Sequence, residues 1–176
     1  PARVSGSAGT GKTIVGLHRA VFLARANPDT RVLLTTFSKT LANSLRTKLK
    51  RLISSEPRLA ERVEVQSMNE VGERLYETHF GHVRIATREE IRSILASIIS
   101  SMEEFKFGLP FVYSEWTDVI DAWQIDSWEG YRDVRRLGRK TRLPDPQRAI
   151  LWSVFEKVRA KLAEQRIKTR AEIFNR

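Results

Sequence analysis

Hydrophobic and polar residues follow two periods in the first half of the chain, one typical of helices and one typical of strands. Residues 12–26 carry apolar side chains at helical spacing, which predicts a helix with one side packed on a sheet. Asn-Pro-Asp at 27–29 ends that helix, and residues 31–36 are predicted to form a β-strand. A second helix, rich in lysine and arginine, is predicted to about Ile53, and residues 62–66 alternate like a short strand. This order of elements is typical of a parallel α/β sheet. The apolar residues of the first helix that are expected against the sheet are Ile14, Val15, Leu17, Val21 and Phe22.

From about Thr87 the pattern changes to one helix after another. Residues 87–90 and 169–172 each have the spacing of a capping box, in which a threonine and a glutamate three residues later satisfy backbone N–H groups at a helix start. Asp145 is predicted to cap a long helix with Pro146 at its first position. We therefore expect a partial α/β domain over residues 1–86 and a mostly helical subdomain over residues 87–176.

A glycine-rich segment precedes the first helix and fulfils the phosphate-loop pattern G-x-x-x-x-G-K-[ST] at every fixed position. Its glycines let backbone N–H groups turn inward around phosphates at a helix N-terminus. Lys12 is expected to reach the β- and γ-phosphates of ATP, and the Thr13 hydroxyl to take one coordination position of Mg²⁺. Lys12 and Thr13 are thus the candidate catalytic residues. The residues expected to bind the nucleotide are Gly6, Ser7, Ala8, Gly9, Thr10, Gly11, Lys12 and Thr13.

Length and charge narrow the class of protein and its partner. The 176 residues suffice for one domain or for one domain and part of another. The formal charge of +10 favours a polyanionic partner. Because the chain has no cysteine, disulfides and thiolate metal sites are excluded. No apolar run is long enough to span a bilayer and no signal-peptide pattern is found, so we expect a cytoplasmic protein with no membrane partner.

Part of the positive charge is concentrated between residues 132 and 142, where only Asp133 opposes it. Trp128 and Tyr131 come just before this cluster. Cations that displace counterions from phosphates, beside aromatic rings that stack on bases, suit a single-stranded DNA groove. The alternative is a solvated face whose aromatic residues belong to the core. The basic residues of the cluster are Arg132, Arg135, Arg136, Arg139, Lys140 and Arg142, of which Arg135, Arg136 and Arg139 are the candidate DNA contacts.

Residues 35–45, Thr-Thr-Phe-Ser-Lys-Thr-Leu-Ala-Asn-Ser-Leu, resemble motif Ia of the UvrD/Rep-type superfamily 1 DNA helicases. Ser-Met-Asn-Glu at 67–70 stands where those helicases have motif Ib, and the helical second half resembles their 1B subdomain. The resemblance implies an N-terminal fragment with part of a P-loop (RecA-like) motor domain, 1A, followed by 1B. It also implies contacts with single-stranded or partly duplex DNA from Thr36, Phe37, Ser38, Lys39, Ser67 and Asn69. By residue type alone, Phe37 also fits a core position, and Ser67 also fits a plain helix cap.

The function implied by the resemblance is that of an ATP-dependent DNA helicase or translocase that uses ATP and Mg²⁺. In such helicases motif II follows 1B, so the fragment is expected to end before it and not to turn over ATP alone. Val-Ile-Asp at 119–121 imitates a Walker B strand, but Ala122 occupies the position of the glutamate and the segment lies in the helical block, so we reject it. Two alternatives stay open: another phosphate-loop enzyme, such as a nucleotide kinase or regulatory ATPase, and a DNA-binding module with a vestigial nucleotide loop.

Overall fold

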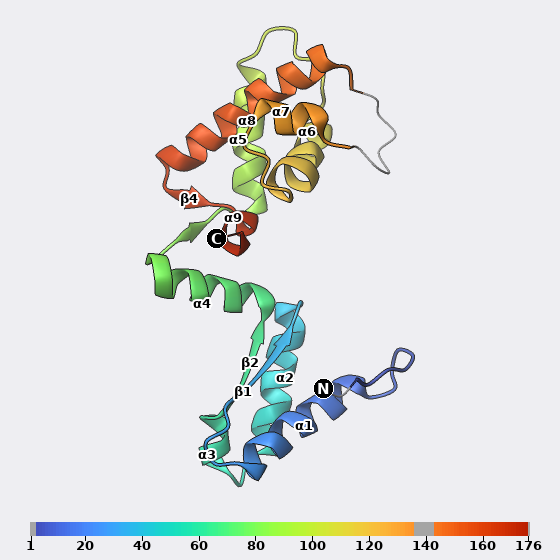
Figure 1. The fold of residues 1–176 in the computed structure, drawn as a ribbon, viewed down its shortest axis with the longest axis vertical. Coiled ribbons are helices and arrows are strands. Elements are labelled where there is room, and N and C mark those ends of the chain that lie inside the picture. Colours follow the sequence, from blue (N-terminus) through green and yellow to red (C-terminus); the bar gives the residue numbers. More distant parts are fainter. Residues whose placement is uncertain (1–2, 136–142, 176) are drawn as a thin grey trace. The chain divides into compact units, whose positions relative to one another are not determined.

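The computed structural model describes residues 3–135 and 143–175. The chain divides into two compact units, residues 1–74 and residues 75–176, and each is described by itself (Figure 1). The expected functional division into residues 1–86 and 87–176 stays a prediction. None of the helices in the described part of the chain is long and apolar enough to cross a membrane.

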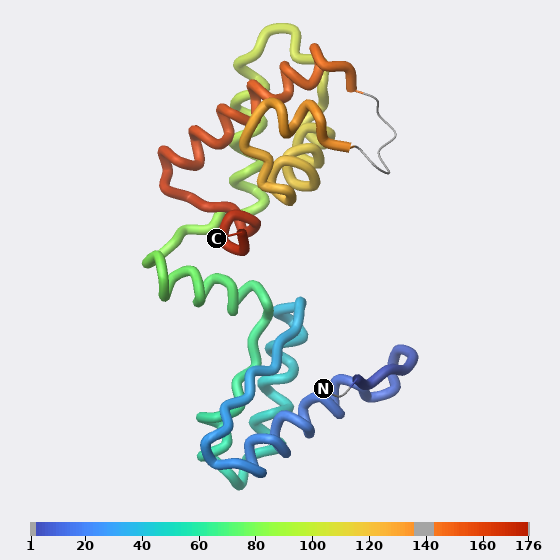
Figure 2. Tube along the Cα trace, in the orientation of Figure 1, coloured from blue at the N-terminus to red at the C-terminus, as the bar shows by residue number. Residues whose placement is uncertain are grey.

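The first unit contains a pair of parallel strands with helices packed beside them. Its elements are α1 (Lys12–Ala26), β1 (Val32–Thr36), α2 (Lys39–Leu52), α3 (Pro57–Ala60), β2 (Val63–Ser67) and the start of α4 (Met68–Phe80). The strands pair in register from Val32 opposite Val63 to Thr36 opposite Ser67. Figure 2 shows them running side by side although α2 and α3 lie between them in the chain. Because the strands are parallel, their carboxyl ends meet at the same edge of the sheet.

The core of the first unit confirms part of the predicted α1 face and corrects the rest. Leu17 and Val21 are buried, together with residues of α2 and both strands. Ile14, Val15 and Phe22, which were also expected against the sheet, are exposed by 38%, 47% and 63%. The reason is that α1 is apolar on more than one side, since Val15 and Phe22 lie two turns apart on a side different from that of Leu17 and Val21.

The second unit is mainly helical. Its elements after α4 are β3 (Arg84–Ile85), α5 (Arg88–Ser100), α6 (Leu109–Glu115), the π-helix η1 (Trp116–Asp121), α7 (Trp128–Asp133), α8 (Asp145–Glu164), β4 (Ile167–Lys168) and α9 (Arg170–Phe174). α8 contributes Leu151, Val154, Phe155 and Val158 to a core that also takes residues from α5, α6 and η1. β3 and β4 form a second, short parallel pair.

The helix starts of the second unit follow the local sequence closely. Thr87 and Thr169 each cap a helix through a complete capping box, as predicted. The prediction for Asp145 is wrong by one position, because Pro144 is the N-cap of α8 and Asp145 is its first residue. An extended backbone at Pro144 (φ −63°, ψ 155°) lets the helix begin before Pro146.

Trp123, which follows the π-helix η1, lies at the surface and not in the core. In an α-helix Trp123 would lie about two turns after Trp116 and would share its buried face. The N–H of Ile125 instead bonds to the carbonyl of Ile120, five residues earlier, at 3.0 Å. This bonding places more residues in each turn, and Trp123 is 75% exposed while Trp116 is 2% exposed. Trp123 therefore lies away from the buried face that Trp116 occupies.

Candidate functional site

The loop before α1 has a backbone that only glycines adopt without strain. Gly9 and Gly11 have φ angles of 83° and 78°, in the left-handed region. A Cβ atom on Gly6 would lie 2.8 Å from the Oγ1 atom of Thr10. Gly6 therefore has a steric role and Gly11 a conformational one, while the space around Gly9 and Gly11 is open, with no atom within 4 Å of the position that a Cβ atom would take.

Lys12 extends its side chain back into this loop. Its Nζ atom donates hydrogen bonds to the carbonyl of Gly6 at 2.8 Å and to the carbonyl of Ser7. The hydroxyl of Thr10 donates to the same Ser7 carbonyl at 2.9 Å. The ammonium thus bonds to loop carbonyls, and phosphate oxygens are stronger acceptors that could take their place.

The first turn of α1 completes this candidate phosphate site. Gly11 is the N-cap, and its carbonyl accepts from the N–H groups of Ile14 and Val15 at 2.9 and 3.0 Å. A helix N-terminus presents backbone N–H groups and a partial positive charge to an anion. Thr13 lies in that turn with an exposed side chain, next to Lys12. The glycine-rich loop, the Lys12 ammonium and the Thr13 hydroxyl together fit a nucleotide phosphate with its Mg²⁺.

A second set of candidate residues gathers where β1 and β2 end. Thr36 is paired with Ser67, so the segments that follow the two strands start side by side. Phe37 comes directly after β1 and is 91% exposed. The core alternative for Phe37 is therefore wrong, because its ring packs against almost nothing. Ser38 caps α2, accepting from the N–H of Leu41 at 3.2 Å, and Lys39 is exposed in the first turn.

Ser67 and Asn69 differ in how far a ligand can reach them. Ser67 is only 1% exposed, and its hydroxyl donates to the carboxylate of Glu70 at 2.9 Å while accepting from the Glu70 N–H at 3.3 Å. The structure thus confirms the interpretation of Ser67 as the N-cap of α4. A direct DNA contact from the Ser67 side chain does not fit this arrangement, because the hydroxyl is buried and engaged. Asn69 is partly exposed in the first turn of α4 and stays a candidate contact.

Glu70, which closes the cap of α4, is strongly acidic. Hydrogen bonds from the Ser67 backbone and hydroxyl, and then from Arg46, lower its pKa to about 2. The Ser67 N–H donates to the Glu70 Oε2 atom at 2.7 Å. Glu70 is therefore ionised at any ordinary pH, and the start of α4 is held by a charge-assisted bond.

The basic cluster is described only in part. Arg135 is exposed, whereas Arg136, Arg139, Lys140 and Arg142 lie outside the described residues. Arg132 is ion-paired with Asp133 at 2.8 Å. Tyr131 is fully buried and donates its hydroxyl to Glu115 at 3.0 Å, so it is a core residue and not a base-stacking one.

Two further residues beside the cluster take part in packing. Trp128 is partly buried against the core of the second unit, so its indole also serves packing. Arg148 of α8 was not singled out from the sequence. It donates to the carbonyl of Tyr131 at 3.0 Å and to that of Leu143 at 3.2 Å. It thereby holds the chain on both sides of residues 136–142.

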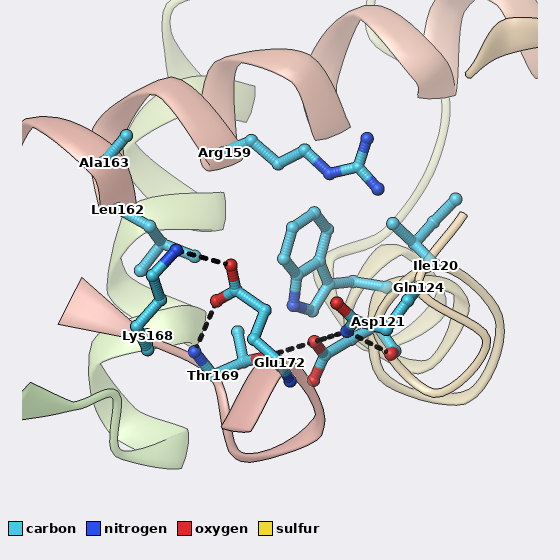
Figure 3. Close-up of a pocket in the computed structure, with 10 residues that line it drawn as sticks. Ile120, Asp121, Gln124, Arg159, Leu162, Ala163, Lys168, Thr169 and Glu172 are labelled. Carbon is cyan, nitrogen blue, oxygen red and sulfur yellow. Dashed lines mark hydrogen bonds and ion pairs between the residues drawn. The ribbon is translucent and has the colours of Figure 1, made fainter. Parts of the chain in front are cut away.

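The second unit contains a separate small cavity of about 210 Å³, drawn in Figure 3. Asp121 lines it, and the carboxylate of Asp121 accepts from the Thr169 hydroxyl and from the Gln124 amide, the latter at 3.1 Å. Burial raises the pKa of Asp121, while both hydrogen bonds act in the opposite direction. Asp121 ends a π-helix and does not follow a strand, which agrees with rejecting it as a Walker B residue.

Arg159 extends toward the same cavity from α8 (Figure 3). Its guanidinium lies 5.3 Å from the centre of the Trp152 ring, and burial lowers its pKa. Lys168 is paired with Glu172 at 3.1 Å, so the cavity wall carries charges of both signs. In the described part of the chain, no group of three or more histidine or acidic residues is arranged to hold a metal ion.

The model of the family described as UvrD/REP helicase N-terminal domain matches residues 1–173. No curated protein matches the chain.

Proposed function

The chain belongs to the UvrD/REP helicase N-terminal domain family, and from this premise we propose that it is the ATP- and DNA-binding part of an ATP-dependent DNA helicase or translocase. Use of ATP and Mg²⁺ is a property of that family. The observation that carries the proposal for this chain is the Lys12 ammonium, which bonds to the carbonyls of Gly6 and Ser7 in the glycine-rich loop at the start of α1.

We assign the phosphate site to residues 6–13 in a P-loop, RecA-like domain. Lys12 exchanges the carbonyls of Gly6 and Ser7 for β- and γ-phosphate oxygens, and the N–H groups of the first turn of α1 bind the same phosphates. The Thr13 hydroxyl is the residue that would hold Mg²⁺, which supplies charge neutralisation between the phosphates when bound. The Gly9 and Gly11 conformations keep side chains out of the path of the phosphates.

We assign the DNA contact of the first unit to the edge where β1 and β2 end, with Thr36, Phe37, Ser38, Lys39 and Asn69 as its surface. Stacking on a base would cover the exposed Phe37 ring, and the Lys39 ammonium would neutralise a phosphate. The Arg135, Arg136 and Arg139 cluster of the helical 1B-like subdomain is proposed as a second DNA contact. In this proposal residues 1–86 belong to the motor domain and residues 87–176 to 1B.

We further propose that the 176-residue chain binds nucleotide without turning it over. In the described residues, no strand is followed by the pair of acidic residues that positions Mg²⁺ and the attacking water. Phosphoryl transfer depends on such positioned charges. Steady ATP hydrolysis by the purified chain, stimulated by DNA and lost in Lys12→Ala, would contradict this part of the proposal.

The proposal is tested by measuring nucleotide and DNA binding on matched variants. Lys12→Ala should abolish binding of a fluorescent ATP analogue with Mg²⁺ and leave binding to a single-stranded oligonucleotide near that of the wild type. Lys157→Ala, an exposed lysine of α8, removes the same charge and should change neither. If oligonucleotide binding is absent from the wild type while nucleotide binding is present, another phosphate-loop enzyme is favoured over a helicase.

A further inference from the structure

Arg46 of α2 contacts β2, α4 and an earlier residue of its own helix. Its Nε atom donates to the carbonyl of Val65 in β2 at 2.8 Å, and its Nη1 atom donates to the Asn43 side chain at 2.7 Å. Its Nη2 atom donates to the Oε2 atom of Glu70 in α4 at 3.0 Å. A planar guanidinium makes such divergent bonds in one fixed orientation, which an ammonium does not reproduce.

The Glu70 oxygen that binds Arg46 is also the oxygen that caps α4. It accepts from the backbone N–H of Ser67 at 2.7 Å and from the Ser67 hydroxyl at 2.9 Å. Arg46 is therefore linked, through one carboxylate atom, to the residue at which β2 ends. Glu70 stays ionised because its pKa is about 2, so the link persists over the ordinary pH range.

This network joins the two segments of the proposed DNA-binding edge. α2, which carries Arg46, begins at Lys39, two residues after Phe37, and α4, which carries Glu70, begins one residue before Asn69. β1 and β2 bring the segments side by side through the pairing of Thr36 with Ser67. Beyond that pairing, Arg46 and Glu70 connect the helices that continue from each segment.

We propose that Arg46, acting through Glu70, is a positioning residue that holds the segments after β1 and β2 in one arrangement for single-stranded DNA. The proposal rests on the proposed function, since it concerns the same edge. Arg46 touches no base in this scheme. It fixes the orientation of α2, which follows Phe37, relative to the start of α4.

The network is separable from the core that stabilises the unit. α2 packs through Ala42, Leu45 and Leu49, which are buried, whereas the side chains of Arg46 and Glu70 are 36% and 25% exposed. Replacement of Arg46 leaves those apolar contacts in place and leaves Glu70 bonded to Ser67. We therefore expect a loss in DNA binding that is larger than any change in thermal stability.

The test measures the affinity of the 176-residue chain for a fluorescent single-stranded oligonucleotide. Arg46→Gln should weaken binding on the order of tenfold, the factor that corresponds to one charge-assisted hydrogen bond. Glu70→Gln, which keeps an acceptor for Ser67 but removes the charge facing Arg46, should weaken it in the same direction. The matched control is Arg25→Gln, in the last turn of α1, which likewise removes one positive charge and an ion pair, here with Glu56. This control should bind DNA like the wild type.

Two further readouts distinguish positioning from a direct contact or a general structural role. In a double-mutant cycle with Phe37→Ala, the effects of Arg46→Gln and Phe37→Ala should not add, because both act on one stacking contact. The salt dependence of binding should stay unchanged in Arg46→Gln. A slope lowered by about 0.7 would instead mean that Arg46 itself binds a phosphate and would overturn the proposal.

The outcomes also separate this inference from the proposed function. If Phe37→Ala weakens DNA binding and Arg46→Gln does not, the positioning role is refuted while the DNA-binding edge stands. Additive effects in the cycle, or an equal loss in Arg25→Gln, refute it as well. If Phe37→Ala has no effect, the assignment of the edge fails, and the positioning role fails with it.

Discussion

Phe37→Ala separates the proposed DNA contact from folding, because the Phe37 side chain has almost no packing to lose. The ring is 91% exposed, so its removal should change the free energy of unfolding by no more than about 0.5 kcal/mol, the range for surface substitutions. Stacking of a base on an aromatic ring contributes about 1–3 kcal/mol. The expected loss of affinity for single-stranded DNA is therefore roughly 5- to 150-fold.

The assay is fluorescence anisotropy of a labelled oligonucleotide, repeated at several salt concentrations. Because Phe37 carries no charge, the salt dependence should stay that of the wild type while the affinity falls at every salt concentration. Phe37→Trp keeps a stacking surface and should bind at least as well as the wild type. Phe174→Ala, at another exposed phenylalanine, is the matched control and should have no effect.

Two results would contradict the proposed stacking role of Phe37. Unchanged affinity in Phe37→Ala would show that the edge after β1 does not stack on DNA. A melting temperature lowered by several degrees would show that the Phe37 ring packs against the protein in solution.

Three other predictions follow from the charges and backbone angles. Joint replacement of Arg135, Arg136 and Arg139 by alanine should lower the salt slope of single-stranded DNA binding by roughly 2 if each contacts one phosphate; an unchanged slope would identify a solvated face. Because the pKa of Glu70 falls from 4.5 to about 2 on folding, its stabilising effect is present above about pH 4.5 and is lost as the pH falls toward 2; thermal unfolding of Glu70→Gln should depend less on pH in this window. Gly9→Ala places a side chain at a φ of 83° and should weaken nucleotide binding. Gly16→Ala, inside α1 with open space around it, should leave nucleotide binding unchanged and raise the free energy of unfolding by roughly 0.5–1 kcal/mol. Equal nucleotide affinities in the two variants would argue against the loop assignment.

Features that depend on a few neighbouring residues could be predicted from the sequence. The capping boxes at Thr87 and Thr169 are local hydrogen-bond patterns, and both form. β1 and β2 were expected within one residue of their observed bounds, because alternation and turn residues mark them. Their parallel pairing was likewise expected from the order of elements.

Features that depend on distant contacts could not be predicted. The guanidinium of Arg46 reaches Val65 and Glu70, which lie 19 and 24 residues further along the chain, and no local spacing indicates these partners. Trp123 lies at helical spacing from the buried Trp116, but the i→i+5 bond from Ile125 to Ile120, which spans it, accompanies its exposure at the surface. For Phe37 the residue type favours burial in general, so its exposure at the end of β1 had to be observed.

The functional assignment of the first unit depends on binding of the ATP phosphates by residues 6–13 through Lys12. It is tested most directly by isothermal titration of the chain with a non-hydrolysable ATP analogue in the presence of Mg²⁺, comparing the wild type with Lys12→Ala and Lys157→Ala. We expect one nucleotide bound per chain in the wild type and in Lys157→Ala, and no measurable binding in Lys12→Ala with an unchanged melting temperature. Equal binding by Lys12→Ala and the wild type would contradict it.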